Sequence, residues 1–293
     1  MCTEVIYRYI SFFDLYNLLE HKLLRIPQAM GFDDKNEGFG FALRKLDGNF
    51  LASLGAPTCF DGPRTVKTLA YISCWTTEPS KIAMWLLYSK DYEGFRIRTT
   101  RTKLRSLFAN YRKSYATFPD RIQDFSPRKD DDVFDVEYVD FHEARKKLKS
   151  RNQDIERTLE SLLRSLSKVD YLRAYSKAAR ETMKSLMFTN EPWSYKDKAY
   201  DHEHEVRAVI EFEASTEEGD SLTGGYGDRN ELTSRFPTNI HVSIPNGFLE
   251  DICIDERCPA YKKAVFKSFL SKYGYALSES QVFSSLFDDE DAT

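Results

Sequence analysis

The sequence lacks the features that define several large classes of protein. No apolar run approaches the roughly 18 residues that a membrane-spanning helix needs, so no membrane partner is expected. The five cysteines are scattered and odd in number, which argues against a disulfide framework and favours reduced thiols in the cytoplasm. The first nine residues lack the basic start and apolar stretch of a signal peptide. These absences predict a cytoplasmic protein.

The common nucleotide-binding motifs are also missing. There is no G-x-G-x-x-G and no G-x4-G-K-[ST], which disfavours a dinucleotide-binding Rossmann domain and a P-loop ATPase. A formal net charge of -4 gives no basis for a general nucleic-acid binder. Cys253 and Cys258 have no second pair at zinc spacing, so no metal is expected.

The composition is that of an ordinary globular protein, since 41% of the 293 residues are hydrophobic and 30% are charged. Strand and helix patterns alternate without a regular βαβ rhythm, which predicts an α+β fold with a mixed or mostly antiparallel sheet. We expect a single domain over 1–293 with a helical insertion at about 143–190, where leucines recur at helical spacing among many charges. The acidic tail, 288–293, is predicted to be disordered.

The periodicities predict individual elements. Strands are expected at 5–11, 23–27, 68–74, 94–100, 133–141, 201–212, 240–244 and 249–254. Helices are expected at 14–22, 81–89, 261–273 and from about residue 100 to 115, with Ser80 and Thr100 or Thr102 as N-caps. Residues 217–230, rich in glycine, are expected to form a surface loop.

The stretch 201–212 carries the strongest chemical signal. Every second residue from Val206 to Phe212 is apolar, the pattern of a half-buried strand. On the other face, Glu203 and Glu205 would stand side by side, because strand residues two apart point the same way. Two adjacent carboxylates raise each other's pKa unless a cation lies near them. We therefore expect the chemical centre here.

Several alternatives stay open at this stage. The two glutamates could be solvated residues of an edge strand, where charge deters aggregation. Arg8 could form only a structural ion pair with one of them. His202 and His204 could bind a metal together with Asp201 and the glutamates, as in a metal-dependent nuclease or hydrolase, although a buried His204 is the simpler interpretation.

The tryptophan and tyrosine of Met84-Trp85-x-x-Tyr88 are most simply core residues, and Trp85 is expected to brace the strand after Gly94. Together with Tyr7-Arg8-Tyr9 and Glu203-x-Glu205-x-Arg207, this motif resembles a bacterial family known only as a domain of unknown function, numbered twenty-nine seventy-one. The loop from Phe32 to Glu37 departs from that family's pattern, and its role is open. The family name supplies no activity.

A second resemblance, to ADP-ribosyltransferases, does imply an activity. Those enzymes carry an Arg on the first strand, a Ser-Thr-Ser-like segment on a middle strand and a later Glu-x-Glu; here the corresponding residues are Arg8, Ser73 with Thr76, and Glu203-x-Glu205. Cys74 and Trp75 interrupt the segment that corresponds to Ser-Thr-Ser. The resemblance implies a split sheet around an NAD cleft.

The residue roles follow from the same resemblance. Arg8 would hold the pyrophosphate, Glu205 would bond the nicotinamide ribose, and Glu203 would orient or deprotonate the acceptor. The predicted NAD contacts are Arg8, Tyr9, Ser73, Thr76 and Tyr88. Such a protein would transfer ADP-ribose to a protein or nucleic acid, or hydrolyse NAD, as a toxin or anti-phage effector with a regulatory protein partner. The competing hypotheses are the metal-dependent nuclease and a non-catalytic sensor or scaffold.

Overall fold

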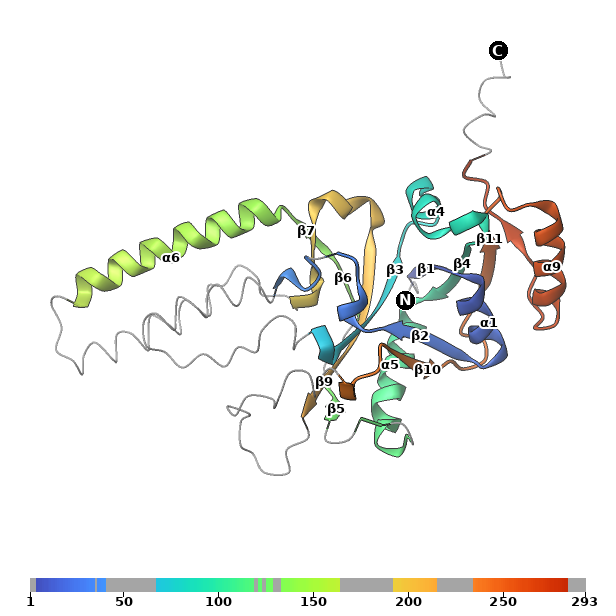
Figure 1. Cartoon of the computed structure of the whole chain (residues 1–293), viewed down its shortest axis with the longest axis horizontal. Helices are drawn as coiled ribbons and strands as arrows, with labels where there is room; N and C mark the ends of the chain where they lie inside the picture. Colours follow the sequence, from blue (N-terminus) through green and yellow to red (C-terminus); the bar gives the residue numbers. More distant parts are fainter. Residues whose placement is uncertain are drawn as a thin grey trace, which may run out of the picture.

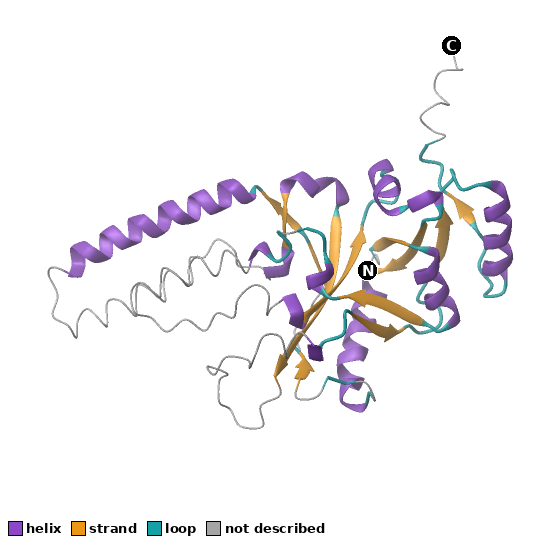
Figure 2. Cartoon of the chain, viewed as in Figure 1, coloured by secondary structure: helices purple, strands orange, loops and turns teal. Residues whose placement is uncertain are grey.

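The structure is a computed structural model. It describes residues 4–34, 36–40, 67–118, 121–122, 125–128, 133–163, 192–214 and 234–283. Helices and strands mix in these residues (Figure 2), in agreement with the predicted α+β class. No described helix combines the length and apolar character needed to cross a membrane.

The main sheet contains eight described strands in the order β12-β11-β4-β1-β3-β9-β5, with β6 paired to β9 (Figure 1). Their bounds are β1 (Val5–Ile10), β3 (Ala70–Thr76), β4 (Phe95–Thr100), β5 (Phe125–Pro127), β6 (Val133–Asp135), β9 (Glu205–Ala214), β11 (Asp251–Ile254) and β12 (Ser278–Glu279). The pairings are antiparallel except for β11 with β12, which confirms the mostly antiparallel sheet.

The sheet is weakly joined in its middle. β1 pairs with β4 along its whole length, and β3 pairs with β9 along its whole length. Between β1 and β3, however, only Tyr7 opposite Thr76 is in register. A separate ribbon of β2 (Leu23–Pro27) and β10 (Asn239–Ser243) approaches β3 through a bridge from Gln28 to Tyr71. The sheet therefore opens between β1 and β3.

Helices cover the core on both sides of this opening. α5 (Arg101–Ser114) buries Leu104, Leu107 and Phe108, and the Thr100 side chain caps it by accepting a bond from the Lys103 amide, as predicted. α1 (Phe12–Glu20) and α9 (Ala260–Ser271) meet through Phe12 and Phe266, whose ring centres are 5.0 Å apart. These contacts anchor the outer half of the sheet, from β1 to β12.

α4 (Ile82–Tyr88) packs over β1 and β11, where Met84 and Trp85 form an apolar cluster with Tyr9 and Cys253. Trp85 is fully buried, as predicted, and meets the Tyr9 ring edge to face at 4.9 Å. The predicted Ser80 cap is wrong, because the helix begins one residue later and its N-cap, Lys81, makes no side-chain cap bond. Gly94 follows in a position where a Cβ would lie 2.6 Å from the Ser89 Cβ, so only glycine fits this close approach.

The expected insertion begins with α6 (Phe141–Leu163), which extends away from the sheet (Figure 1). Its first turn is fixed to the rest of the molecule by Phe141, which stacks on Phe39 with ring centres 3.6 Å apart. The remainder of the expected insertion, the glycine-rich stretch 217–230 and the tail 288–293 lie outside the described residues.

The strand predicted at 201–212 is partly wrong. Lys198–Glu203 forms a short 3-10 helix, η5, and His204 follows in the left-handed region at φ 43°, so β9 begins only at Glu205. From Glu205 on the predicted alternation holds. The apolar side chains at every second position from Val206 to Phe212 are buried in the main core, as predicted. β9 is buried on both faces, because Val209 joins a second apolar cluster on the opposite side.

The remaining elements are short. They are β7 (Glu137–Val139), β8 (Tyr195–Asp197), which pairs with β7, and the 3-10 turns η1 (Ala29–Gly31), η2 (Lys90–Tyr92), η3 (Tyr115–Thr117) and η4 (Pro192–Ser194).

Candidate functional site

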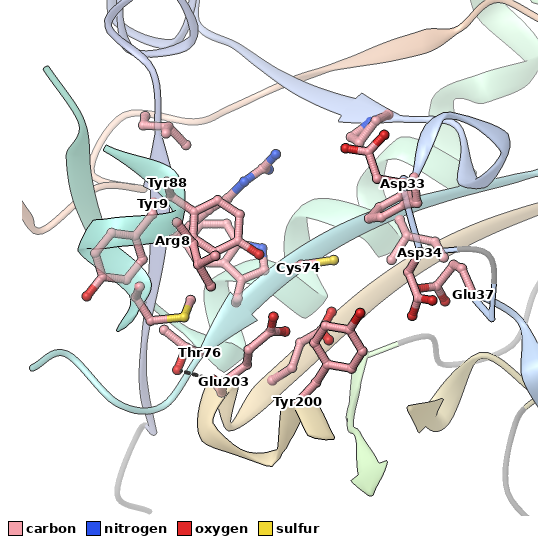
Figure 3. A pocket seen from close by; sticks show the side chains of 18 of the residues that line it. Arg8, Tyr9, Asp33, Asp34, Glu37, Cys74, Thr76, Tyr88, Tyr200 and Glu203 are labelled. Carbon is pink, nitrogen blue, oxygen red and sulfur yellow. Dashed lines mark hydrogen bonds between the residues drawn. The ribbon is translucent and has the colours of Figure 1, made fainter. Parts of the chain in front are cut away.

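A cavity of about 650 Å³ lies at the opening between β1 and β3. This volume falls within the roughly 300–1,000 Å³ typical of small-molecule sites. In Figure 3, Tyr9, Tyr88 and Thr76 lie on one side, Asp33, Asp34 and Glu37 on the other, and Glu203 and Tyr200 between them. The cavity lining also includes Tyr7, Arg8, Ser11, Asp14, Arg25, Phe32, Ile72, Cys74, Trp75, Met84, Leu87, Lys196 and Glu205.

Six of the seven residues singled out from the sequence line this cavity. They are Arg8, Tyr9, Thr76, Tyr88, Glu203 and Glu205, which come from β1, β3, α4, η5 and β9. Ser73 is fully buried beneath the wall and reaches the site indirectly, because its hydroxyl accepts a bond from Arg8 Nη1 at 2.8 Å. The structure thus brings together segments that lie up to about 200 positions apart in the chain.

A row of five buried charges of alternating sign forms one wall. Arg207 donates from both terminal nitrogens to Glu37, at 2.6 and 2.9 Å, and from Nε to Glu205 Oε1 at 2.9 Å. Lys196 Nζ donates to Glu205 Oε2 at 3.0 Å and to Glu203 Oε2. We call this row, Glu37–Arg207–Glu205–Lys196–Glu203, the charge ladder. All of its members except Arg207 line the cavity.

Position in the ladder sets the ionisation of each carboxyl group. Although burial opposes it, Arg207 and Lys196 lower the pKa of Glu205 to about 2. Burial raises the pKa of Glu203 above its ordinary value, although Lys196 opposes this effect. Burial would lower the pKa of Lys196, but the Glu205 and Glu203 carboxylates raise it above its ordinary value. Glu203, at the end of the ladder, is therefore the carboxylate closest to exchanging a proton.

The cation between the two glutamates is Lys196, so the alternative in which Arg8 forms a structural ion pair with one of them is wrong. Arg8 lies on β1, across the opening, and donates to the Ser73 hydroxyl and to the Arg25 carbonyl at 3.2 Å. It forms no ion pair with any residue that the structure describes. Its neighbour Arg25 is neutralised by Asp14, with Nε 2.6 Å from Oδ1. Among the described residues, Arg8 is thus a cavity cation without a carboxylate partner.

Two tyrosines form an aromatic side of the cavity. Tyr9 donates its hydroxyl proton to the Pro79 carbonyl at 3.0 Å, and burial raises the pKa of Tyr9 to about 12. Tyr88 stacks against Tyr9 with ring centres 6.3 Å apart but is 46% exposed. The expectation that Tyr88 is a core residue is therefore wrong, because α4 turns it toward the cavity. Thr76 fixes the glutamate segment by donating to the Glu203 carbonyl at 2.6 Å.

Cys74 lies on the cavity wall beside Glu205. It is half-buried, and burial together with the Glu205 carboxylate raises the pKa of its thiol well above the ordinary value. The thiol is therefore protonated at neutral pH and is not an activated nucleophile.

The histidine pair does not assemble with the glutamates. His204 is exposed rather than buried, since its left-handed backbone turns it away from the line of β9, and His202 is half-buried. Among the residues with described positions, no group of three or more His, Cys, Asp or Glu side chains is placed to hold a metal ion.

Sequence reasoning missed three members of the site. Lys196 stands among several lysines with no spacing that distinguishes it. Glu37 belongs to the loop that departs from the family pattern, and it reaches Arg207 across 170 positions of sequence. Tyr200 lies 4.8 Å from Lys196 Nζ, measured to its ring centre. Arg207 alone carried a signal, as the last residue of Glu-x-Glu-x-Arg.

Comparison with known proteins supports one of the two resemblances. Residues 84–208 match the family model described as "Protein of unknown function (DUF2971)". The match runs from α4 into β9 and so contains Tyr88 and most of the charge ladder, but it leaves out Arg8, Tyr9, Ser73 and Thr76. No curated protein and no solved structure matches the chain. The resemblance to ADP-ribosyltransferases remains a prediction.

Proposed function

We propose that the protein binds NAD in this cavity and breaks the bond between nicotinamide and ribose. The observation that supports this is the convergence of Arg8, Tyr9, Thr76, Tyr88, Glu203 and Glu205 on one cavity of suitable volume. Arg8, Thr76, Glu203 and Glu205 are also the residues that the resemblance to ADP-ribosyltransferases predicts at an NAD cleft.

Arg8 is the group suited to the pyrophosphate. A guanidinium binds phosphate oxygens through paired hydrogen bonds, and Arg8 has no carboxylate that would compete for it among the described residues. Its present acceptors, the Ser73 hydroxyl and the Arg25 carbonyl, are neutral and hold it in place. Tyr88, exposed at the rim and backed by Tyr9, offers a flat surface for a ring of the ligand.

The carboxylates are suited to the bond-breaking step. When the ribose C1′–N bond breaks, its electron pair leaves with nicotinamide, which becomes neutral, and positive charge develops on the ribose carbon. Nearby carboxylates stabilise that charge. An oxygen of water or of an acceptor then forms the new bond to C1′ and gives its proton to a general base, a step worth about 10²–10⁴ in rate.

Glu203 is the better candidate for direct contact with the ligand. Its Oε2 bonds Lys196, but Oε1 receives no hydrogen bond from the described residues. Both oxygens of Glu205 are already occupied by Arg207 and Lys196. In this proposal Glu203 contacts the ribose and takes the proton. Glu205, which was expected to bond the ribose, instead stabilises the positive charge on the ribose without contacting it.

The test is incubation of the pure protein with NAD, followed by chromatographic measurement of nicotinamide. The proposal expects release by the wild type, loss of at least a hundredfold in Glu203→Gln, and no change in Lys198→Met, an exposed lysine outside the cavity. No release by the wild type, together with no heat of binding in a calorimetric titration with NAD, would overturn it.

The expected biological role follows from NAD loss. A protein that consumes NAD harms the cell that makes it, which suits a toxin or an anti-phage effector held in check by a regulatory protein. The acceptor, if one exists, is a protein or a nucleic acid. Expression of the wild type should slow growth and lower cellular NAD, and Glu203→Gln should do neither.

A second candidate is a non-catalytic sensor that binds a nucleotide without cleaving it. The observation that favours it is the saturation of Glu205, whose two oxygens are held by buried cations as in a purely structural network. Binding of NAD without nicotinamide release during a prolonged incubation would select this candidate over the enzyme.

A further inference from the structure

Lys196 joins the two glutamates by donating from its Nζ to both. It lies on β8, whereas Glu203 ends η5 and Glu205 begins β9, so three separate elements meet at its ammonium group. The side chains are almost entirely enclosed, at 11% exposure for Lys196, 7% for Glu203 and 2% for Glu205. Solvent therefore cannot substitute for the lysine in neutralising the pair.

We propose that Lys196 is a positioning residue of this site, which ties Glu203 and Glu205 into one unit and presents Glu203 Oε1 to the cavity. The proposal rests on the proposed function, in which Glu203 accepts a proton from water or from the acceptor. Nothing in the sequence pattern or the family match assigns Lys196 a role; its contacts alone do so.

The physical need for the lysine comes from the crowding of two negative charges. Each carboxylate raises the pKa of the other unless a cation lies between them. Glu205 keeps Arg207 whatever happens at position 196, so Glu203 is the group that would take up a proton if Lys196 lost its charge. A protonated Glu203 cannot act as a base. Lys196 thus decides whether the site can accept a proton at neutral pH.

Among the other groups around this pair, His202 also lowers the pKa of Glu203, but its effect is smaller than that of Lys196. Burial raises the pKa of Tyr138 to about 12 and raises that of Cys74, so both are neutral near pH 7. The groups that face the pair from neighbouring elements are Tyr138 on β7, Tyr88 on α4, Cys74 on β3, Tyr200 and His202 on η5, and Arg207 on β9. Arg207 is committed to Glu37 and Glu205.

The first arm of the test is the pH dependence of nicotinamide release in Lys196→Met, with Lys198→Met as the matched control. Glu203 must lose its proton to act, so kcat should fall on the acid side of its profile. In Lys196→Met this acid limb should move to higher pH by about one unit or more. Lys196→Arg should restore most of the wild-type limb, and Lys198→Met should leave it unchanged. A Lys196→Met profile with the wild-type limb would overturn the proposal.

The second arm does not need activity. Protein labelled with ¹³C at the glutamate side-chain carboxyl carbon gives an NMR signal for Glu203, assigned by its loss in Glu203→Gln. The proposal expects the chemical shift of an ionised carboxylate at pH 7 in the wild type, and that of a neutral one in Lys196→Met. A neutral Glu203 in the wild type would overturn it, even if Lys196→Met failed to fold.

The two arms separate this inference from the function on which it rests. If the wild type neither binds nor cleaves NAD, the proposed function fails, whereas the carboxyl signal still reports whether Lys196 holds Glu203 ionised. If NAD is cleaved but Glu203 stays ionised in Lys196→Met, the function stands and the role of Lys196 is refuted.

Discussion

The two ends of the cavity differ in whether their charged side chains form ion pairs within the protein. At the β9 end every charge of the ladder has an ion partner within the protein, and only one oxygen of Glu203 has no donor among the described residues. At the β1 end Arg8 is held by neutral acceptors and forms no ion pair within the described structure, since the nearby Asp14 pairs with Arg25. The charges of the first end pair with one another, whereas under the proposed function the charge of Arg8 is available to an anionic ligand.

This difference predicts how each end responds to mutation. A substitution in the charge ladder leaves a buried charge without its partner and should lower the free energy of unfolding. Substitution of Arg8 removes no buried counter-charge and should affect binding instead. Four changes, ordered by their expected effect on the free energy of unfolding, test this contrast.

The largest effect is expected from Arg207→Met. Loss of the guanidinium leaves Glu37 and Glu205 without their shared cation, and breaking a buried ion pair in this way costs about 3–5 kcal/mol. Urea unfolding measures it. Arg128→Met is the control, since Arg128 pairs with Glu211 at the surface, where such contacts contribute about 0–1 kcal/mol. Equal losses in both variants would contradict the ladder as a buried unit.

The next effect is a loss of stability in acid. The pKa of Glu205 is lowered to about 2 in the folded state from an ordinary value near 4.5, so its contribution is present above pH 4.5 and is lost as the pH falls toward 2. A shift of this size corresponds to about 3 kcal/mol. Unfolding free energies measured from pH 6 to pH 2 should therefore fall more steeply in the wild type than in Glu205→Gln. Parallel curves would show that Glu205 is not held ionised by its neighbours.

A smaller effect is expected from Glu205→Gln itself at pH 7. The amide keeps the shape of the side chain but removes the charge between Lys196 and Arg207, each of which retains a second carboxylate. The expected loss of about 1–3 kcal/mol is that of a removed hydrogen-bonding partner. Thermal or urea unfolding would measure it. A variant more stable than the wild type would indicate two crowded carboxylates relieved of repulsion, contrary to the ladder.

Arg8→Met should have the smallest effect on folding, below about 1 kcal/mol, because its two acceptors are neutral and the buried Ser73 hydroxyl keeps the bond from Trp75 Nε1. Its effect should appear in binding. A charged hydrogen bond to phosphate contributes about 1.5–3 kcal/mol, so affinity for NAD should fall by about ten- to one-hundredfold. A large loss of stability in this variant would mean that Arg8 is a structural residue.

Part of this contrast was predictable from the sequence. The apolar alternation from Val206 to Phe212 identified the central strand, because period-two burial is a local property of a strand. The Thr100 cap was predictable for the same reason, since it depends on residues three positions apart. Arg8, Tyr9, Thr76 and Tyr88 were found through family patterns, which carry information that local periodicity does not.

The rest could not be predicted from local rules. The backbone leaves the strand pattern at His204, whose left-handed conformation depends on η5 and its contact with Thr77. Glu37 meets Arg207 only because a distant loop folds over β9, and Lys196 reaches the glutamates through the pairing of β8 with β7. The placement of counter-charges is a property of tertiary packing, so the sequence indicated where the carboxylates lie but not what neutralises them.

The central claim is that the Arg8 end of the cavity accepts an anion while the ladder end keeps its own charges. Calorimetric titration of NAD into the wild type, Arg8→Met and Lys198→Met tests it most directly. The account predicts binding by the wild type and Lys198→Met, and affinity lower by about ten- to one-hundredfold for a folded Arg8→Met. Equal affinity of wild type and Arg8→Met for NAD would contradict it.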